Sequence, residues 1–231
     1  MIKKHLSLAA LAACTAAGFQ SASAATIAIT NHSFESAVTN SVGTTPTGWT
    51  AEAAGGLVNL DASDVSYTDN TNGLDGAQVA FWTSGSDIAG RGLSQVLSGE
   101  KALDNTTYTL TLGLGERNFT TRFSGLTIEL RLADDTVLGS AQFGLNDVTF
   151  ATAAENGEVV DVSANFNLAD VDNTQDLKVV LLAGGGTSGG STGRQSIDID
   201  NVRLEYTAIP EPSATALLGL GGMTLLLRRR R

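Results

Sequence analysis

Residues 107–114 constrain the fold most strongly, because apolar and small polar side chains alternate without a break. The apolar positions are Tyr108, Leu110, Leu112 and Leu114, and the positions between them are threonines and Gly113. Successive side chains of a β-strand point to opposite faces, so a period of two indicates a strand with one face in a core. Residues 126–132 repeat the pattern. Two such segments predict a sheet that is covered by a hydrophobic core on one face.

Seven further segments have the composition of strands between turn signals, and none has a helical period. They are residues 26–30, 77–82, 92–97, 136–143, 158–166, 177–183 and 196–206. The last begins with Ile197 and Ile199 facing inward and ends after an expected bulge near Asn201. Roughly nine or ten strands without helices predict an all-β antiparallel sandwich. Its expected core includes Leu110, Leu112, Ile128, Leu130, Val180 and Ile199.

The N-terminus has the three parts of a secretory signal peptide. Lys3 and Lys4 precede an apolar run, residues 6–19, and Ala22-Ser23-Ala24 forms a cleavage site of small side chains. We expect cleavage after Ala24. The alternative is lipidation of Cys14, which follows a lipobox-like Leu-Ala-Ala. Because Cys14 is the only cysteine, neither outcome leaves a thiol for a disulfide.

Residues 25–208 have the size of one domain and are strongly acidic. They hold 8 basic and 23 acidic residues, a net charge near −15. Such a surface repels phosphate groups, so nucleic acid and anionic lipid are not expected partners of the body. The charge suits an exported protein that takes up divalent cations.

The C-terminus, residues 209–231, combines a rigid tripeptide, an uncharged run and a basic end. Pro210 and Pro212 flank Glu211, and the uncharged run is residues 213–227. Four arginines follow, Arg228, Arg229, Arg230 and Arg231. Fifteen residues form a helix of roughly 22 Å, shorter than the ~30 Å hydrocarbon core. A short hydrophobic helix with a cytoplasmic basic end is therefore expected, and one alternative is a plain single-span membrane anchor.

The same three parts, in this order, resemble the PEP-CTERM sorting signal of Gram-negative bacteria. The resemblance implies recognition by a membrane-embedded processing enzyme, an exosortase, and an association with exopolysaccharide. The protein would then pass through an inner-membrane intermediate before it reaches the cell surface or the extracellular matrix. The resemblance covers the tail alone, so it indicates where the protein is sorted and does not indicate an activity.

The two ends of the body resemble galactose-binding-like jelly rolls, the fold of many carbohydrate-binding modules. Asn31-His32-Ser33-Phe34-Glu35 matches the opening of that fold, and Ile199-Asp200-Asn201-Val202 matches its closing strand. The resemblance implies a structural calcium ion between the first and last strands. Glu35 and Asp200 would be its ligands and Asn31 or Asp198 would assist, since calcium prefers hard oxygen donors. The alternative is that these groups only bond turns and strand ends.

A sugar ligand needs an exposed aromatic platform, for which Tyr67, Trp82 and Trp49 are the candidates. Tyr67 lies in a polar loop, whereas Trp49 is also suited to packing beside Phe34. Few residues of the body suit catalysis, because His32 is its only histidine and the sequence has no zinc-binding motif. We therefore expect a carbohydrate-binding or structural module and not an enzyme. The alternatives are a secreted polysaccharide-active enzyme with two carboxylates across a groove, and an anchored surface protein without a sugar ligand.

Overall fold

The structure is a computed structural model, and it describes the residues of the domain body in twelve stretches. These are residues 23–36, 45–52, 59–61, 68–69, 73–76, 78–84, 90–115, 121–123, 125–144, 158–171, 174–184 and 194–209. Residues 1–22 of the predicted signal peptide and residues 210–231 of the sorting tail, and with them the predicted C-terminal helix, lie outside the described residues. Within the described part no helix is long and apolar enough to cross a membrane.

The described residues form thirteen strands and no helix. The strands are β1 (Ala25–Ile27), β2 (Thr50–Glu52), β3 (Asn59–Asp61), β4 (Thr68–Asp69), β5 (Val79–Ser84), β6 (Gly92–Lys101), β7 (Thr106–Gly115), β8 (Thr121–Phe123), β9 (Leu126–Leu132), β10 (Val137–Phe143), β11 (Glu158–Leu168), β12 (Asp176–Ala183) and β13 (Arg194–Ala208). The nine predicted strands are all present within a few residues of their expected limits.

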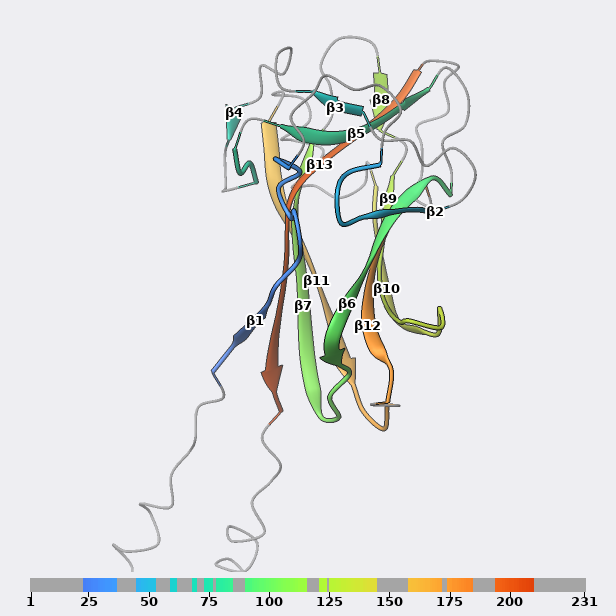
Figure 1. Cartoon of the computed structure of the whole chain (residues 1–231). Coiled ribbons are helices and arrows are strands. Elements are labelled where there is room, and N and C mark those ends of the chain that lie inside the picture. Colours follow the sequence, from blue (N-terminus) through green and yellow to red (C-terminus); the bar gives the residue numbers. More distant parts are fainter. Residues whose placement is uncertain are drawn as a thin grey trace, which may run out of the picture.

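Two sheets pack face to face, and the long strands of each run along the length of the domain (Figure 1). The eight-stranded sheet has the order β3-β5-β13-β7-β11-β4, with β1 and β8 also paired to β13. The five-stranded sheet has the order β10-β9-β12-β6-β2. All pairs are antiparallel except β4 with β11 and β8 with β13, which are short. The predicted all-β antiparallel sandwich is confirmed.

The core consists of the inward side chains of both sheets, as the alternation predicts. Leu110, Leu112, Ile128, Leu130 and Ile199 are fully buried in it. Val180 is also buried, but on the opposite face of its strand, where it lies between Ser94 and Glu129 in register. The strand β12 is apolar on both faces, so its sequence alone does not tell which side chains enter the main core.

The final strand contains the expected bulge. Its pairing with β7 shifts in register between Asp200 and Arg203, and Asn201 has φ of 48°. Asparagine tolerates this left-handed backbone better than most residues. The shift brings Val202 and Leu204 into the core after Ile199, so both halves of the strand present their apolar side inward.

Candidate functional site

The site is built around Asp200, which points away from the main core and is nevertheless 1% exposed. Its register partner on β7 is Gly113. A Cβ atom at Gly113 would lie only 1.8 Å from the carbonyl oxygen of Gly73. The backbone of the segment that begins at Gly73 is therefore pressed against the outer face of the sheet here. This segment separates the carboxyl group of Asp200 from solvent.

Asp200 accepts two backbone hydrogen bonds in this enclosed position. The N–H of Asp75 donates to Oδ2 at 2.7 Å, and the N–H of Asn201 donates to Oδ1 at 2.7 Å. The pKa of Asp200 is raised from 3.8 to about 8, mainly by burial and to a lesser extent by the charges of Asp75 and Glu35, while the two N–H donors act to lower it. A buried carboxyl with negative neighbours is stabilised by a proton or by a cation.

Glu35 reaches the same segment from the turn that follows β1. Asn31 and Phe34 both have positive φ in this turn, at 51° and 58°. Glu35 Oε1 accepts the N–H of Gln78 at 2.6 Å, and a Cβ at Gly76 would lie 2.4 Å from the same oxygen. Glu35 and Asp200 therefore both bind the backbone of residues 75–78. The structure brings these two predicted ligands to one place.

The predicted helper Asn31 does not join them. The side-chain amide of Asn31 accepts the N–H of Ser36 at 2.8 Å and donates to the carbonyl of Thr47 at 3.1 Å, so it holds its own turn together. Asp198 is 1% exposed and lies opposite Phe81 and Gly115 in register. Within the described part of the chain, no three His, Cys, Asp or Glu side chains are placed to hold a metal ion. The predicted four-residue ligand set is therefore not assembled.

Asp75 is a member of the site that sequence reasoning missed. Its side chain contacts His32, with 2.9 Å between Oδ2 and Nε2, and both side chains are about half exposed, at 50% and 45%. In the sequence, residues 72–76 have the composition of a turn, which gives no sign that Asp75 meets Asp200. His32 is thus held in a surface pair beside the turn, as expected of a polar loop residue.

The tryptophans do not form a sugar-binding platform, and the predictions for Trp49 and Trp82 as ligand contacts are wrong. Trp82 is 1% exposed, because its strand position faces the core. Trp49 is 6% exposed, and its ring centroid lies 5.5 Å from that of Phe34. Its indole N–H donates to the carbonyl of Asn31 at 3.1 Å. Tyr67 lies outside the described residues.

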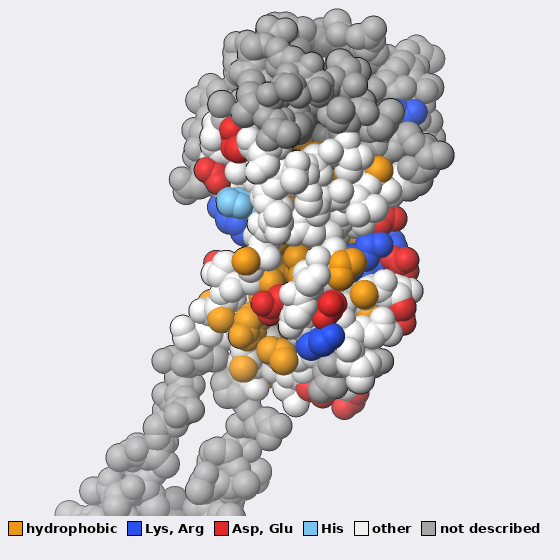
Figure 2. All heavy atoms as spheres, in the orientation of Figure 1, with side chains coloured by type: hydrophobic (Ala, Val, Ile, Leu, Met, Phe, Trp, Pro, Cys, Tyr) orange, Lys and Arg blue, Asp and Glu red, His pale blue; other side chains and the backbone are white. Residues whose placement is uncertain are grey.

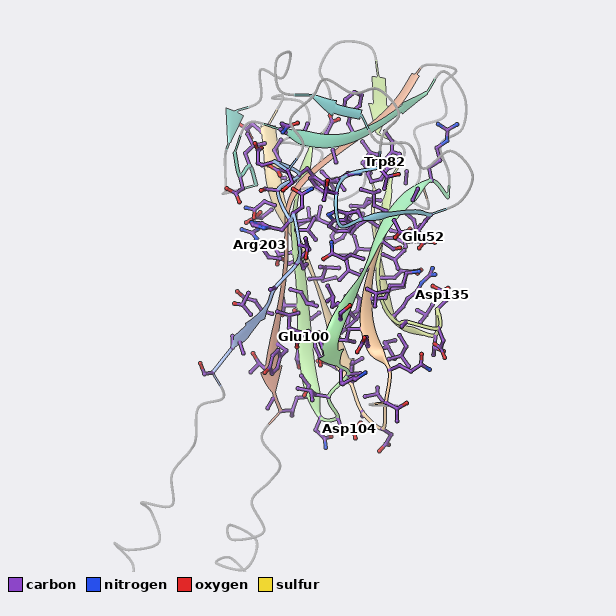
Figure 3. All side chains as sticks on the ribbon, viewed as in Figure 1. Glu52, Trp82, Glu100, Asp104, Asp135 and Arg203 are labelled. Atoms are coloured by element: carbon purple, nitrogen blue, oxygen red, sulfur yellow. The ribbon has the colours of Figure 1, made fainter. Side chains whose placement is uncertain are left out.

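The outer face of the five-stranded sheet carries a network of ion pairs (Figure 3). Lys178 on β12 contacts Glu52 on β2 and Asp135 in the turn before β10, each at 2.8 Å. Arg131 on β9 pairs with Glu129 and, at 3.4 Å, with Asp135. Burial acts to raise the pKa of Glu52, but Lys178 outweighs it and the pKa is lowered. The carboxylates of Glu52 and Asp135 are therefore held in their charged form.

A groove of about 310 Å³ runs along the edge of the sandwich between the two sheets. Its lining residues are Ala28, Thr30, Gly48, Gln95, Val96, Leu97, Ser98 and Glu100. Gln95 spans it, because its Oε1 accepts the N–H of Thr30 at 2.7 Å and its Nε2 donates to the carbonyls of Thr30 and Gly48, both at 2.9 Å. The groove has no aromatic lining residue, so it offers a sugar ring no stacking surface.

Comparison with known families gives two matches that together cover most of the chain. Residues 25–205 match the family described as HpiC1 cyclase, HpiC1-like. Residues 208–231 match the PEP-CTERM protein-sorting motif, which confirms the sorting signal predicted for the tail. No curated protein matches the chain.

Among solved structures, a cyclase from Fischerella sp. is similar at 22% identity with a TM-score of 0.59, covering 82% of this chain and all of that one. The arabinose-bound α-L-arabinofuranosidase MgGH51 gives 15% identity and a TM-score of 0.50, covering 79% of this chain and 26% of that one. A tandem of CBM22 domains from Paenibacillus barcinonensis gives 17% identity and a TM-score of 0.46, covering 85% and 50%. The likeness to the cyclase and to the arabinofuranosidase concerns the fold alone.

Proposed function

We propose that this chain, a member of the HpiC1 cyclase family that carries a PEP-CTERM protein-sorting motif, is an exported jelly-roll module that binds or organises exopolysaccharide. The sorting motif and the sandwich fold support this proposal. The sorting motif marks the chain for export to the cell surface. We further propose that the tail is inserted in the inner membrane, processed by an exosortase-type enzyme, and removed before the body enters the extracellular matrix. The body is a binding or structural unit and not an enzyme.

The observation that supports a non-enzymatic role is the pKa and the accessibility of the carboxyl groups. Among the described carboxyl groups with a shifted pKa, four have it lowered by nearby donors or cations, Glu52, Asp134, Asp135 and Asp176. Asp200 has a raised pKa, but the segment from Gly73 covers it. A general acid must be protonated near neutral pH and must reach its substrate. None of these carboxyl groups meets both conditions.

A second candidate function follows from the family match. A cyclase would need a protonated or polar group at an open pocket, and a polysaccharide-active enzyme would need two carboxylates across a groove. Glu52 and Glu129 lie on the same sheet face, but each is bound to a cation. This arrangement favours a structural network over a catalytic pair.

We also propose that one calcium ion stabilises the body at Glu35 and Asp200. The donor set fits a hard cation in kind, because it offers only oxygen and because burial and two acidic neighbours disfavour the free carboxylate of Asp200. Backbone carbonyls of the same turn would complete the shell. The ion would contribute stability and would keep the segment at residues 75–78 attached to β13; it would take no part in a reaction.

One experiment separates the binding and enzymatic functions. Protein purified from the producing cells is incubated with their isolated exopolysaccharide, and both sedimentation with the polymer and the soluble products are measured. We expect the protein to sediment with the polymer and to release no new oligosaccharides. The double variant Glu52→Gln, Glu129→Gln should behave in the same way. Product formation that this double variant abolishes would show instead that the protein is an enzyme.

A further inference from the structure

We propose that one end of the domain lies against the outer surface of the inner membrane for as long as the sorting tail remains attached. This membrane-proximal end is defined by residues 102–105, residues 169–171 and Ile209. Leu103 and Ile209 would enter the lipid interface, and the partner is a membrane surface of neutral headgroups. The inference rests on the proposed function, because it requires the tail to be in the membrane.

Both termini of the folded body leave from this end (Figure 1). Strand β1 pairs with the last residues of β13, with Ala25 opposite Tyr206 and Ile27 opposite Leu204. The end of β13 pairs with the start of β7, where Ala208 lies opposite Thr106. The first and last described residues of the body therefore lie side by side at one end of the domain.

The connection between the body and the tail is only a few residues long. The N–H of Ile209 donates to the carbonyl of Asn105 at 2.7 Å, so the chain is held to the body until one residue before Pro210. The uncharged run begins at Ser213, four residues after Ile209. Four residues span at most about 14 Å when fully extended. The membrane-proximal end must stay within that distance of the point where the uncharged run begins.

The side chains at this end suit an interface between water and lipid. Leu103 is 41% exposed and Ile209 is 46% exposed, and they are two of the four large hydrophobic side chains that are exposed in the described residues. Tyr206 is partly buried against Tyr108, with ring centroids 5.9 Å apart, and continues the apolar surface up β13. Figure 2 shows apolar side chains gathered on the lower part of the domain, next to the terminal segments.

The charges at this end select the type of lipid. Asp104 and Asp170 are exposed, and Asp104 is labelled at this end in Figure 3. Oδ1 of Asp104 accepts the N–H of Val171 at 2.7 Å, which ties the two turns together. Lys101, the nearest cation in the described residues, is paired with Asp176 at 2.6 Å. A net negative end is repelled by anionic headgroups, so contact should be stronger on neutral lipid.

The orientation has a consequence for the opposite end. Strand β13 has fifteen residues and ends at the membrane-proximal end. At about 3.3 Å per residue it spans roughly 50 Å. The far end of the sandwich, where β13 begins at Arg194, would therefore stand well away from the lipid. That end would be the one free to meet a polymer while the precursor is still anchored.

The test uses the full chain after signal-peptide removal, which also removes Cys14. Leu103→Cys and, as the matched control at the far end, Arg91→Cys are labelled with a fluorophore and reconstituted into vesicles carrying lipid-attached quenchers. We expect strong quenching at position 103 and little at position 91 in vesicles of phosphatidylcholine. Adding phosphatidylglycerol should weaken the quenching at position 103. Equal, weak quenching at both positions in a protein that resists alkaline extraction would overturn the inference.

Two further measurements separate the inference from the function on which it rests. If alkaline carbonate extracts the protein from the vesicles, the membrane-inserted tail itself is refuted. If the tail is inserted, a flexible glycine-serine linker placed after Ile209 should release the domain and abolish the quenching at position 103. Quenching that persists unchanged with this linker would contradict the argument from the short connection.

Discussion

Asp200 accepts a backbone N–H from Asp75, 125 residues earlier in the chain, at 2.7 Å. This bond attaches the turn around Asp75 to the closing strand, and it does so with a carboxyl group that is buried and has acidic neighbours. The stability of this part of the molecule therefore depends on what neutralises Asp200. A proton and a cation are the two means of neutralisation, and each leads to a separate prediction.

The first prediction concerns pH in the absence of calcium. Between pH about 4 and about 8 the native state holds a proton on Asp200 that the unfolded chain has lost. The free energy of unfolding must then fall as the pH rises through this window. At 1.36 kcal/mol for each unit of pKa shift, the loss is on the order of several kcal/mol. Urea unfolding in chelator should show it, and Asp200→Asn should flatten the profile. Glu205→Gln, an exposed change on the same strand, should leave it unaltered.

The second prediction concerns calcium at neutral pH. An ion that binds only the native state stabilises it by about 2.7 kcal/mol when its free concentration is a hundred times the dissociation constant. Chelator should therefore lower the melting temperature of the wild-type protein, and Asp200→Asn and Glu35→Gln should each remove most of the difference. Glu205→Gln should keep it. Superimposable melting curves with chelator and with millimolar calcium would contradict the proposed ion.

The third prediction concerns the core. Leu112 is fully buried, so Leu112→Ala removes buried apolar surface and leaves a cavity. Such changes cost about 2–5 kcal/mol of unfolding free energy. Val137→Ala is the matched control, because Val137 is 51% exposed and its truncation should change stability by less than about 0.5 kcal/mol. Equal effects in urea unfolding would show that residues 107–114 do not form the interior of the sandwich.

The fourth prediction concerns the side-chain amide of Gln95. Gln95→Leu keeps the size of the side chain but removes the partners of the Thr30 N–H and of two carbonyl groups. These hydrogen bonds are part-buried, and each such bond contributes about 0.5–1.5 kcal/mol. We expect a loss of stability and faster amide exchange at Thr30. Gln142→Leu, an exposed change on β10, should have neither effect.

The sequence was most informative where local periodicity decides the structure. The alternation in residues 107–114 and 126–132 predicted both strands and their buried sides, and the Asp-Asn pair at positions 200 and 201 predicted the bulge. Short strands escaped prediction, because β2, β3, β4 and β8 have two or three residues each and too little pattern to read. Trp82 is not the exposed member of its aromatic pair, and neither is Phe81, because both faces of β5 are buried there, at 1% and 6% exposure.

The site was harder to predict, because it depends on contacts between distant parts of the chain. The jelly-roll resemblance led to Glu35 and Asp200, but no local pattern placed Asp75 beside them. The same holds for Lys178, a charged residue that is 9% exposed because Glu52 and Asp135 reach it from two other strands or turns. Burial of a charge is set by its partners, and these are visible only in the folded chain.

The intact mass of the protein recovered from washed exopolysaccharide of the producing cells tests the central claim most directly. An exported module that is sorted by its tail should be present there, should begin at Ala25 and should lack residues 225–231. Glu211→Ala should instead leave full-length precursor in the membrane fraction. Recovery of the wild-type protein only from the membrane, with Arg228 to Arg231 still attached, would contradict the account and would leave a permanently anchored protein.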